Sequence, residues 1–180
     1  MSASGFAGAA SGQVDLERLA LSSGQARSID LELDLDPIEL GGQTYAAAGG
    51  GGEAKLDVSR TTTGYALRLR FATELIGPCV RCLEDASNGI EIDSREVDQP
   101  ASRDEELRSP YVSDGELDVH RWANDALVLD LPDQLLCRPD CAGLCSVCGE
   151  SLNDADPETH RHSEGGDPRM AKLRDLRLDS

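Results

Sequence analysis

Apolar and polar side chains alternate along the first third of the chain, and this pattern predicts a β-strand. From Ile29 to Leu35 every second residue is Ile or Leu, the residues between them are Asp or Glu, and Pro37 follows the run. A period of two places one set of side chains on a single, half-buried face. We therefore expect a strand here that ends before the proline.

A longer alternating run predicts a hairpin that carries cysteines. The run Tyr65–Leu75 leads directly to Cys79 and Cys82, and residues 90–92 resume the apolar pattern. Two alternating segments that flank a short break read as paired strands, so the cysteine pair is expected at the hairpin tip. Glycine pairs and alternation earlier in the chain predict at least one further hairpin.

The clearest helical patterns lie in the second half of the chain. Asp118 is a suitable N-cap for a helix that passes through Trp122 and ends before Pro132, although residues 128–131 could also form a strand. An Asp-Pro pair opens a second, partly amphipathic segment at residues 167–180, which predicts a short terminal helix.

These elements predict an α+β fold, mainly antiparallel β-sheet with hairpins, one or two short helices and a C-terminal cysteine-rich zinc knuckle. The length suits one ordinary domain rather than two. The expected organisation is a flexible N-terminal arm at 1–25, a single β-rich domain at 26–153 with an acidic loop at 93–118 and a zinc knuckle at 137–149, a linker at 154–166 and a helix at 167–180.

The charge balance narrows the choice of partners. The chain has 34 acidic and 17 basic residues, a formal net charge of −17. Such a field repels DNA and anionic membranes but attracts basic proteins, among which ribosomal proteins are the commonest. The first residues have no basic start followed by a long apolar run, so we expect a cytoplasmic protein.

Six cysteines carry the candidate chemistry. In a reducing compartment, cysteines at short regular spacings are more typical of metal ligands than of disulfides. We predict one structural zinc ion held by Cys137, Cys141, Cys145 and Cys148, because four ligands within twelve residues close a site at small cost in loop entropy.

Two other interpretations of the cysteines stay open. In a ribbon-like arrangement, Cys79 and Cys82 would share the metal with Cys145 and Cys148, as two equivalent knuckles. Alternatively, Cys79 and Cys82 could form a redox-active thiol pair beside Arg81. No nucleophile and base are paired along the sequence, and the two histidines at 160 and 162 are interpreted as solvated, so we do not expect an enzyme.

The order of motifs resembles that of the YceD family. The resemblance rests on four segments: Gly77-Pro-Cys79-Val-Arg-Cys82-Leu83, Leu129-Asp-Leu131-Pro132, the second cysteine group with Leu152-Asn153, and Asp167-Pro168-Arg169. It implies a non-enzymatic role in the accumulation or stability of large-subunit ribosomal RNA, through a basic large-subunit ribosomal protein or the ribosomal RNA precursor. Direct RNA binding is the alternative, for which the basic residues near the C-terminus are the local candidates.

Overall fold

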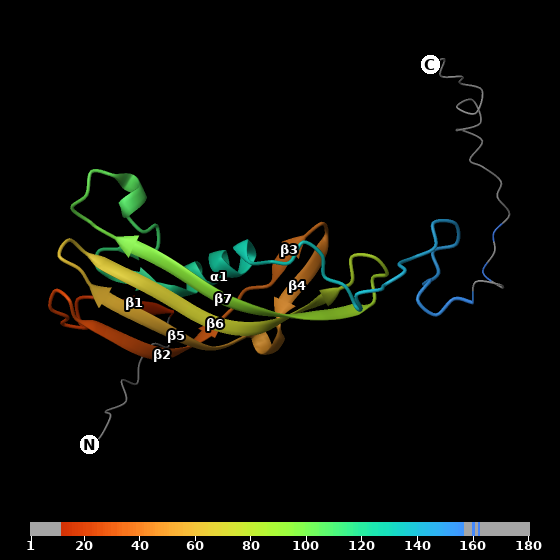
Figure 1. Ribbon diagram of the computed structural model, residues 1–180, viewed down its shortest axis with the longest axis horizontal. Coiled ribbons are helices and arrows are strands. Elements are labelled where there is room, and N and C mark those ends of the chain that lie inside the picture. The colour runs from red at the N-terminus through yellow and green to blue at the C-terminus, as the bar shows by residue number, and fades with distance from the viewer. Residues whose placement is uncertain (1–11, 157–159, 161, 163–180) are drawn as a thin grey trace, which may run out of the picture.

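The computed structural model describes residues 12–156 together with His160 and His162. Its largest element is a six-stranded antiparallel sheet in which the long strand β6 is central (Figure 1). One edge of β6 pairs with β5 and β4, and the other pairs with β7 along its whole length. The strands are β2 (Ala26–Asp34), β3 (Ile38–Leu40), β4 (Gln43–Ala47), β5 (Gly51–Arg60), β6 (Tyr65–Pro78) and β7 (Asp85–Asp98).

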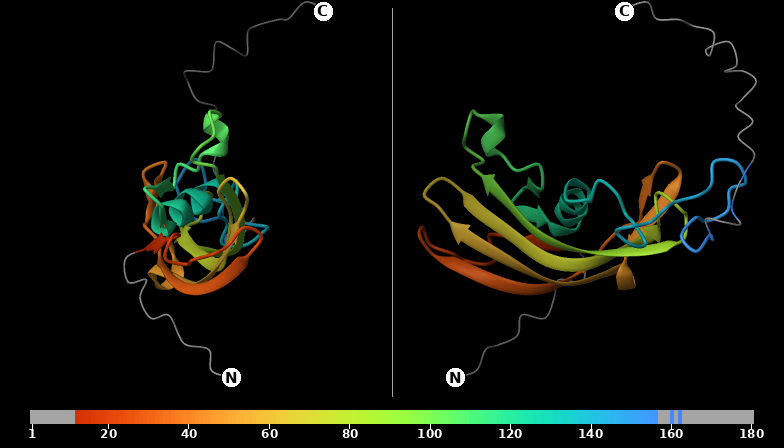
Figure 2. Two further views of the ribbon diagram at one scale, coloured as in Figure 1. Left: turned by 90° about the vertical axis from the view of Figure 1, so that its left-hand side faces the viewer. Right: turned by 45° about the vertical axis from the view of Figure 1, so that its right-hand side comes forward.

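A smaller layer covers the concave face of this sheet (Figure 2). It consists of the helix α1 (Val119–Leu129) and a three-stranded sheet in the order β1-β9-β8. The strands are β1 (Gln13–Asp15), β8 (Val112–Ser113) and β9 (Glu116–Asp118), and two 3-10 turns, η1 (Ala48–Gly50) and η2 (Glu105–Leu107), complete the described elements. The core lies between the two layers, because the buried side chains of the large sheet and of α1 belong to one hydrophobic cluster.

The mainly antiparallel β-fold with one α-helix confirms the sequence-based expectation. Alternation had predicted β2 and the β6–β7 hairpin, whose tip carries the first cysteine pair. Asp118 is the N-cap of α1, where its carboxylate accepts a hydrogen bond from the backbone N–H of Arg121 at 2.9 Å. Within the described residues, no helix is long and apolar enough to cross a membrane.

Two segments differ from the expectation. Residues 12–25, predicted as part of a flexible arm, include β1, and Leu16 is fully buried. The predicted acidic loop at 93–118 is strand up to Asp98 and again in β8 and β9. β1 is ordered by pairing with the distant strand β9, whereas the acidic segment is ordered by the hairpins β6–β7 and β8–β9. The proposed helix at 167–180 lies outside the described residues.

Gly64 offers a direct test of the packing around β6. A Cβ atom at this position would lie 1.8 Å from the backbone oxygen of Asp98, at the end of β7. Because a backbone atom cannot rotate away, we expect Gly64→Ala to lower the free energy of unfolding by about 1–3 kcal/mol. Gly89→Ala is the matched control on β7, where a Cβ meets nothing within 4 Å. Equal urea midpoints for the two variants would contradict this packing.

Candidate metal centre

The tip of the β6–β7 hairpin folds into a tight cysteine loop. The backbone N–H of Cys79 donates to the carbonyl oxygen of Glu84 at 2.7 Å, and that of Leu83 donates to the carbonyl of Cys79 at 2.9 Å. The backbone N–H of Arg81 also points at the Cys79 sulfur, with a distance of 3.4 Å. These bonds turn the side chains of Cys79 and Cys82 toward the same side.

A second segment brings two further cysteines to this tip from the end of α1. The backbone N–H of Val80 donates to the carbonyl of Leu135 at 2.9 Å, and Leu135 is itself buried. The guanidinium of Arg81 donates to the carbonyl oxygen of Cys141 at 3.0 Å. The segment that follows α1 is therefore fixed against the hairpin tip, which places Cys137 and Cys141 beside the first pair.

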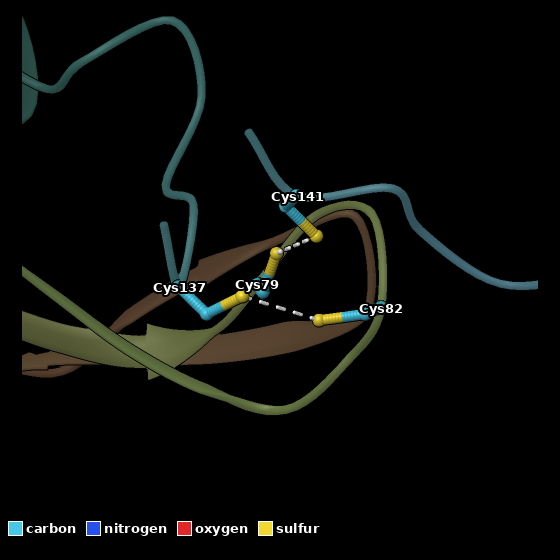
Figure 3. Close-up of side chains that lie close together, drawn as sticks. All are labelled: Cys79, Cys82, Cys137 and Cys141. Carbon is cyan, nitrogen blue, oxygen red and sulfur yellow. Dashed lines mark hydrogen bonds between the residues drawn. The ribbon is translucent and has the colours of Figure 1, made fainter. Parts of the chain in front are cut away.

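The four sulfur atoms converge in one cluster (Figure 3). All of them lie within 4.8 Å of one another, and three of the four residues are buried. The Sγ atoms of Cys79 and Cys141 are 3.7 Å apart, and those of Cys82 and Cys137 are 3.5 Å apart. Sulfurs at the corners of a tetrahedral zinc site are separated by about 3.8 Å, close to these two distances, so the residues present fit a zinc ion.

The surroundings of the sulfurs favour a negative charge on one thiol of the pair. Burial raises the pKa of Cys79, but hydrogen bonds from backbone N–H groups, led by that of Cys82, lower the pKa to about 6. Burial is the main cause that raises the pKa of Cys82 to about 12. Opposite shifts of the pKa on two neighbouring thiols are expected where their sulfurs share one proton or one cation.

Cys145 and Cys148 belong to a different cluster. Their sulfur atoms and ring nitrogens of His160 and His162 lie within 4.8 Å of one another. The four predicted zinc ligands are therefore divided, two in each cluster. The ribbon-like alternative also differs from the structure, because Cys79 and Cys82 lie with Cys137 and Cys141.

Sequence reasoning missed the histidines and one amide that surround these clusters. His160 and His162 had been interpreted as solvated, although a His-x-His spacing shortly after Cys-x-x-Cys was available as a signal. Asn153 contacts the segment that carries Cys137 and Cys141. Its side-chain amide lies 3.9 Å from the Cys137 sulfur, and its side-chain oxygen accepts from the backbone N–H of Ala142 at 2.9 Å.

The cysteine clusters fall inside a segment that matches a family model. The model is described as large ribosomal RNA subunit accumulation protein YceD, and it matches residues 67–177, more than half of the chain. This chain belongs to the YceD family. The matched segment begins in β6 and includes the hairpin tip, α1 and both cysteine groups, so the residues that could hold a metal ion lie within the matched part of the chain.

Several relatives are similar to a large part of the chain. An uncharacterized protein of Mycobacterium tuberculosis is 35% identical over 126 residues, which cover 66% of this chain and 58% of the relative. A Zea mays protein is named large ribosomal RNA subunit accumulation protein YCED homolog 1, chloroplastic. It is 27% identical over 175 residues, which cover 77% of this chain and 59% of the relative. The chain thus spans less than two thirds of the curated relatives it matches. No solved structure is significantly similar to it.

Proposed function

We propose that this YceD-family protein promotes the accumulation or stability of large-subunit ribosomal RNA as a cytoplasmic, non-enzymatic binding protein. We further propose that one structural zinc ion is held by Cys79, Cys82, Cys137 and Cys141. The observation that carries the proposal is the convergence of these four sulfurs, from the hairpin tip and the segment after α1, inside the segment that matches the family model.

The donor set supports a structural rather than a catalytic metal. A catalytic zinc ion keeps one position open for water or substrate, whereas four protein sulfurs fill the tetrahedral shell. Cys79 is 0% exposed and Cys141 is 2% exposed, so neither substrate nor oxidant can reach them without unfolding. Zinc here would join two segments whose own apolar contacts are few. The same burial argues against a redox role for Cys79 and Cys82.

Ion pairs on the face of the large sheet opposite α1 argue against RNA as the main ligand of that face. Arg68 and Arg70 lie on the face opposite α1, but each has a carboxylate partner at 2.6 Å, Asp93 and Asp57 respectively. Near the metal centre, Arg138 lies 3.7 Å from a carboxylate oxygen of Asp140. Arginines that are already neutralised contribute little to phosphate binding, so a basic protein partner is the better match.

Exposed apolar side chains at the hairpin tip indicate where a protein partner would bind. Val80 is 48% exposed and Leu83 is 57% exposed, and Leu83 also has a left-handed backbone with a φ of 63°. Apolar residues this exposed contribute little to the core, and neighbouring exposed apolar side chains often mark binding sites. We propose this tip as the contact surface for a basic large-subunit ribosomal protein.

A complementation experiment tests this function. In cells that lack their own copy, the wild type should restore the ratio of large-subunit to small-subunit ribosomal RNA. Leu83→Asp should restore it at most half as well, because a carboxylate at the tip interrupts an apolar contact. Val97→Asp is the control, since Val97 is 42% exposed at the opposite end of β7. Equal restoration by both variants would contradict the tip as the contact surface.

Binding to isolated partners separates the protein partner from RNA. We expect purified basic large-subunit ribosomal proteins to bind in the absence of RNA, and the Leu83→Asp variant to bind at least tenfold more weakly. If the chain instead binds precursor RNA alone, with an affinity that falls steeply as salt rises, phosphate contacts dominate and the direct RNA-binding alternative replaces this proposal.

A further inference from the structure

The two Cys-x-x-Cys loops of the chain adopt the same local structure. In each loop the backbone N–H of the first cysteine donates to the carbonyl of the glutamate five positions later, at 2.7 Å for Cys79 and 2.8 Å for Cys145. The backbone N–H four positions after the first cysteine, that of Leu83 or Gly149, donates to the carbonyl oxygen of that cysteine at 2.9 and 2.8 Å. The backbone N–H two positions after it, that of Arg81 or Val147, lies 3.4 Å from its sulfur.

The equivalence extends to the backbone conformation. The residue after the second cysteine is left-handed in both loops, Leu83 with a φ of 63° and Gly149 with a φ of 76°. Backbone N–H groups aimed at the sulfur stabilise a thiolate, and such tight loops turn two sulfurs toward one ion. The loop at Cys145–Cys148 is therefore built for metal binding in the same way as the one at the hairpin tip.

Two imidazoles complete the second loop, in place of two further thiols. The Sγ atom of Cys148 lies 3.6 Å from Nε2 of His160, and Nε2 of His162 lies 3.2 Å from the same nitrogen. In a tetrahedral zinc site with two sulfur and two nitrogen ligands, these separations are about 3.6 Å and about 3.3 Å. We propose that Cys145, Cys148, His160 and His162 bind a second zinc ion, independently of the first cluster.

A carboxylate orients one of these imidazoles for metal binding. Nε2 of His160 faces the sulfur of Cys148, while its Nδ1 lies 3.5 Å from a carboxylate oxygen of Glu150. Metal-bound histidines commonly direct their second ring nitrogen to a carboxylate, which fixes the ring and selects the nitrogen that binds. The His160 side chain is only 14% exposed, so the ring is held in this position rather than solvated.

The second site differs from the first in charge and access. Two thiolates and two neutral imidazoles balance the charge of Zn²⁺, whereas four thiolates leave an excess of two negative charges. Cys148 is exposed, while three of the four ligands in the first cluster are buried. We therefore expect the second zinc ion to exchange faster, and its loss to release the segment around His160 without unfolding the β-sheet.

Metal content and X-ray absorption on the full chain test this inference. The wild type should contain about two zinc ions, with a mean shell of about three sulfurs and one nitrogen per ion. The double variant His160→Ala with His162→Ala should lose one ion, and the remaining ion should have sulfur ligands only. His120→Ala, on α1, is the matched control and should keep both ions.

A conservative variant separates ligation from a structural role. His160→Cys should retain the second ion and raise the mean share of sulfur, because a thiolate can replace the imidazole as a ligand. A wild type with one ion in an all-sulfur shell, or a double histidine variant that keeps both ions, would overturn the second site. Failure of the first site has a different outcome, a single ion bound by two sulfurs and two nitrogens.

Discussion

Cys79→Ser should lose the first zinc ion and lower the free energy of unfolding by at least about 3 kcal/mol, since zinc binding at structural sites is worth on the order of 10 kcal/mol. Cys79 is fully buried and its sulfur lies 3.7 Å from that of Cys141. Serine nearly preserves the volume of cysteine, so little of this loss would come from packing. Urea unfolding of zinc-loaded protein, followed by circular dichroism, measures the change.

A comparison in the presence of a chelator separates the metal from the side chain. If zinc is the cause, wild type and Cys79→Ser should unfold at nearly the same urea concentration once the metal is removed. Cys148→Ser is the matched control, because its exposed thiol belongs to the other cluster and its loss should leave the β-sheet stable. A loss in Cys79→Ser that persists in chelator would assign the effect to packing instead.

The sequence could predict the hairpin tip but not which cysteines meet there. Alternation along β6 and β7 gave the strands, because a period of two is a local property. The grouping of Cys137, Cys141, Cys145 and Cys148 relied on the low cost of a short loop. That cost grows only by about 0.6 kcal/mol for each doubling of loop length. Contacts such as the hydrogen bonds from Val80 to Leu135 and from Arg81 to Cys141 can offset such a difference, and they hold Cys137 and Cys141 at the tip.

The order of residues 12–25 escaped prediction for a related reason. Leu16 and Leu19 are too few to show a period, yet both are buried. β1 pairs with β9, more than 100 residues later in the chain, and this pairing supplies the backbone hydrogen bonds that the segment lacks by itself. Local patterns therefore give the central sheet, whereas long-range contacts decide the N-terminal strand and which cysteines meet at the hairpin tip.

The only tryptophan of the chain should be the most sensitive position of the layer that covers the sheet. Trp122 is 1% exposed, its indole N–H donates to Ser94 on β7 at 2.8 Å, and its ring stacks on Tyr111 with centroids 6.0 Å apart. We expect Trp122→Ala to lower the free energy of unfolding by about 3–5 kcal/mol, because it leaves a large cavity between α1 and the sheet.

Two further variants divide this loss between packing and hydrogen bonding. Trp122→Phe keeps most of the apolar contact but leaves the Ser94 hydroxyl without its donor, so it should cost about 1–3 kcal/mol. Leu129→Ala, on the same helix but 83% exposed, should change stability by less than about 0.5 kcal/mol. Since the Trp122 variants have no tryptophan, unfolding is followed by circular dichroism. A Trp122→Ala protein as stable as Leu129→Ala would mean that α1 does not hold this layer on the sheet.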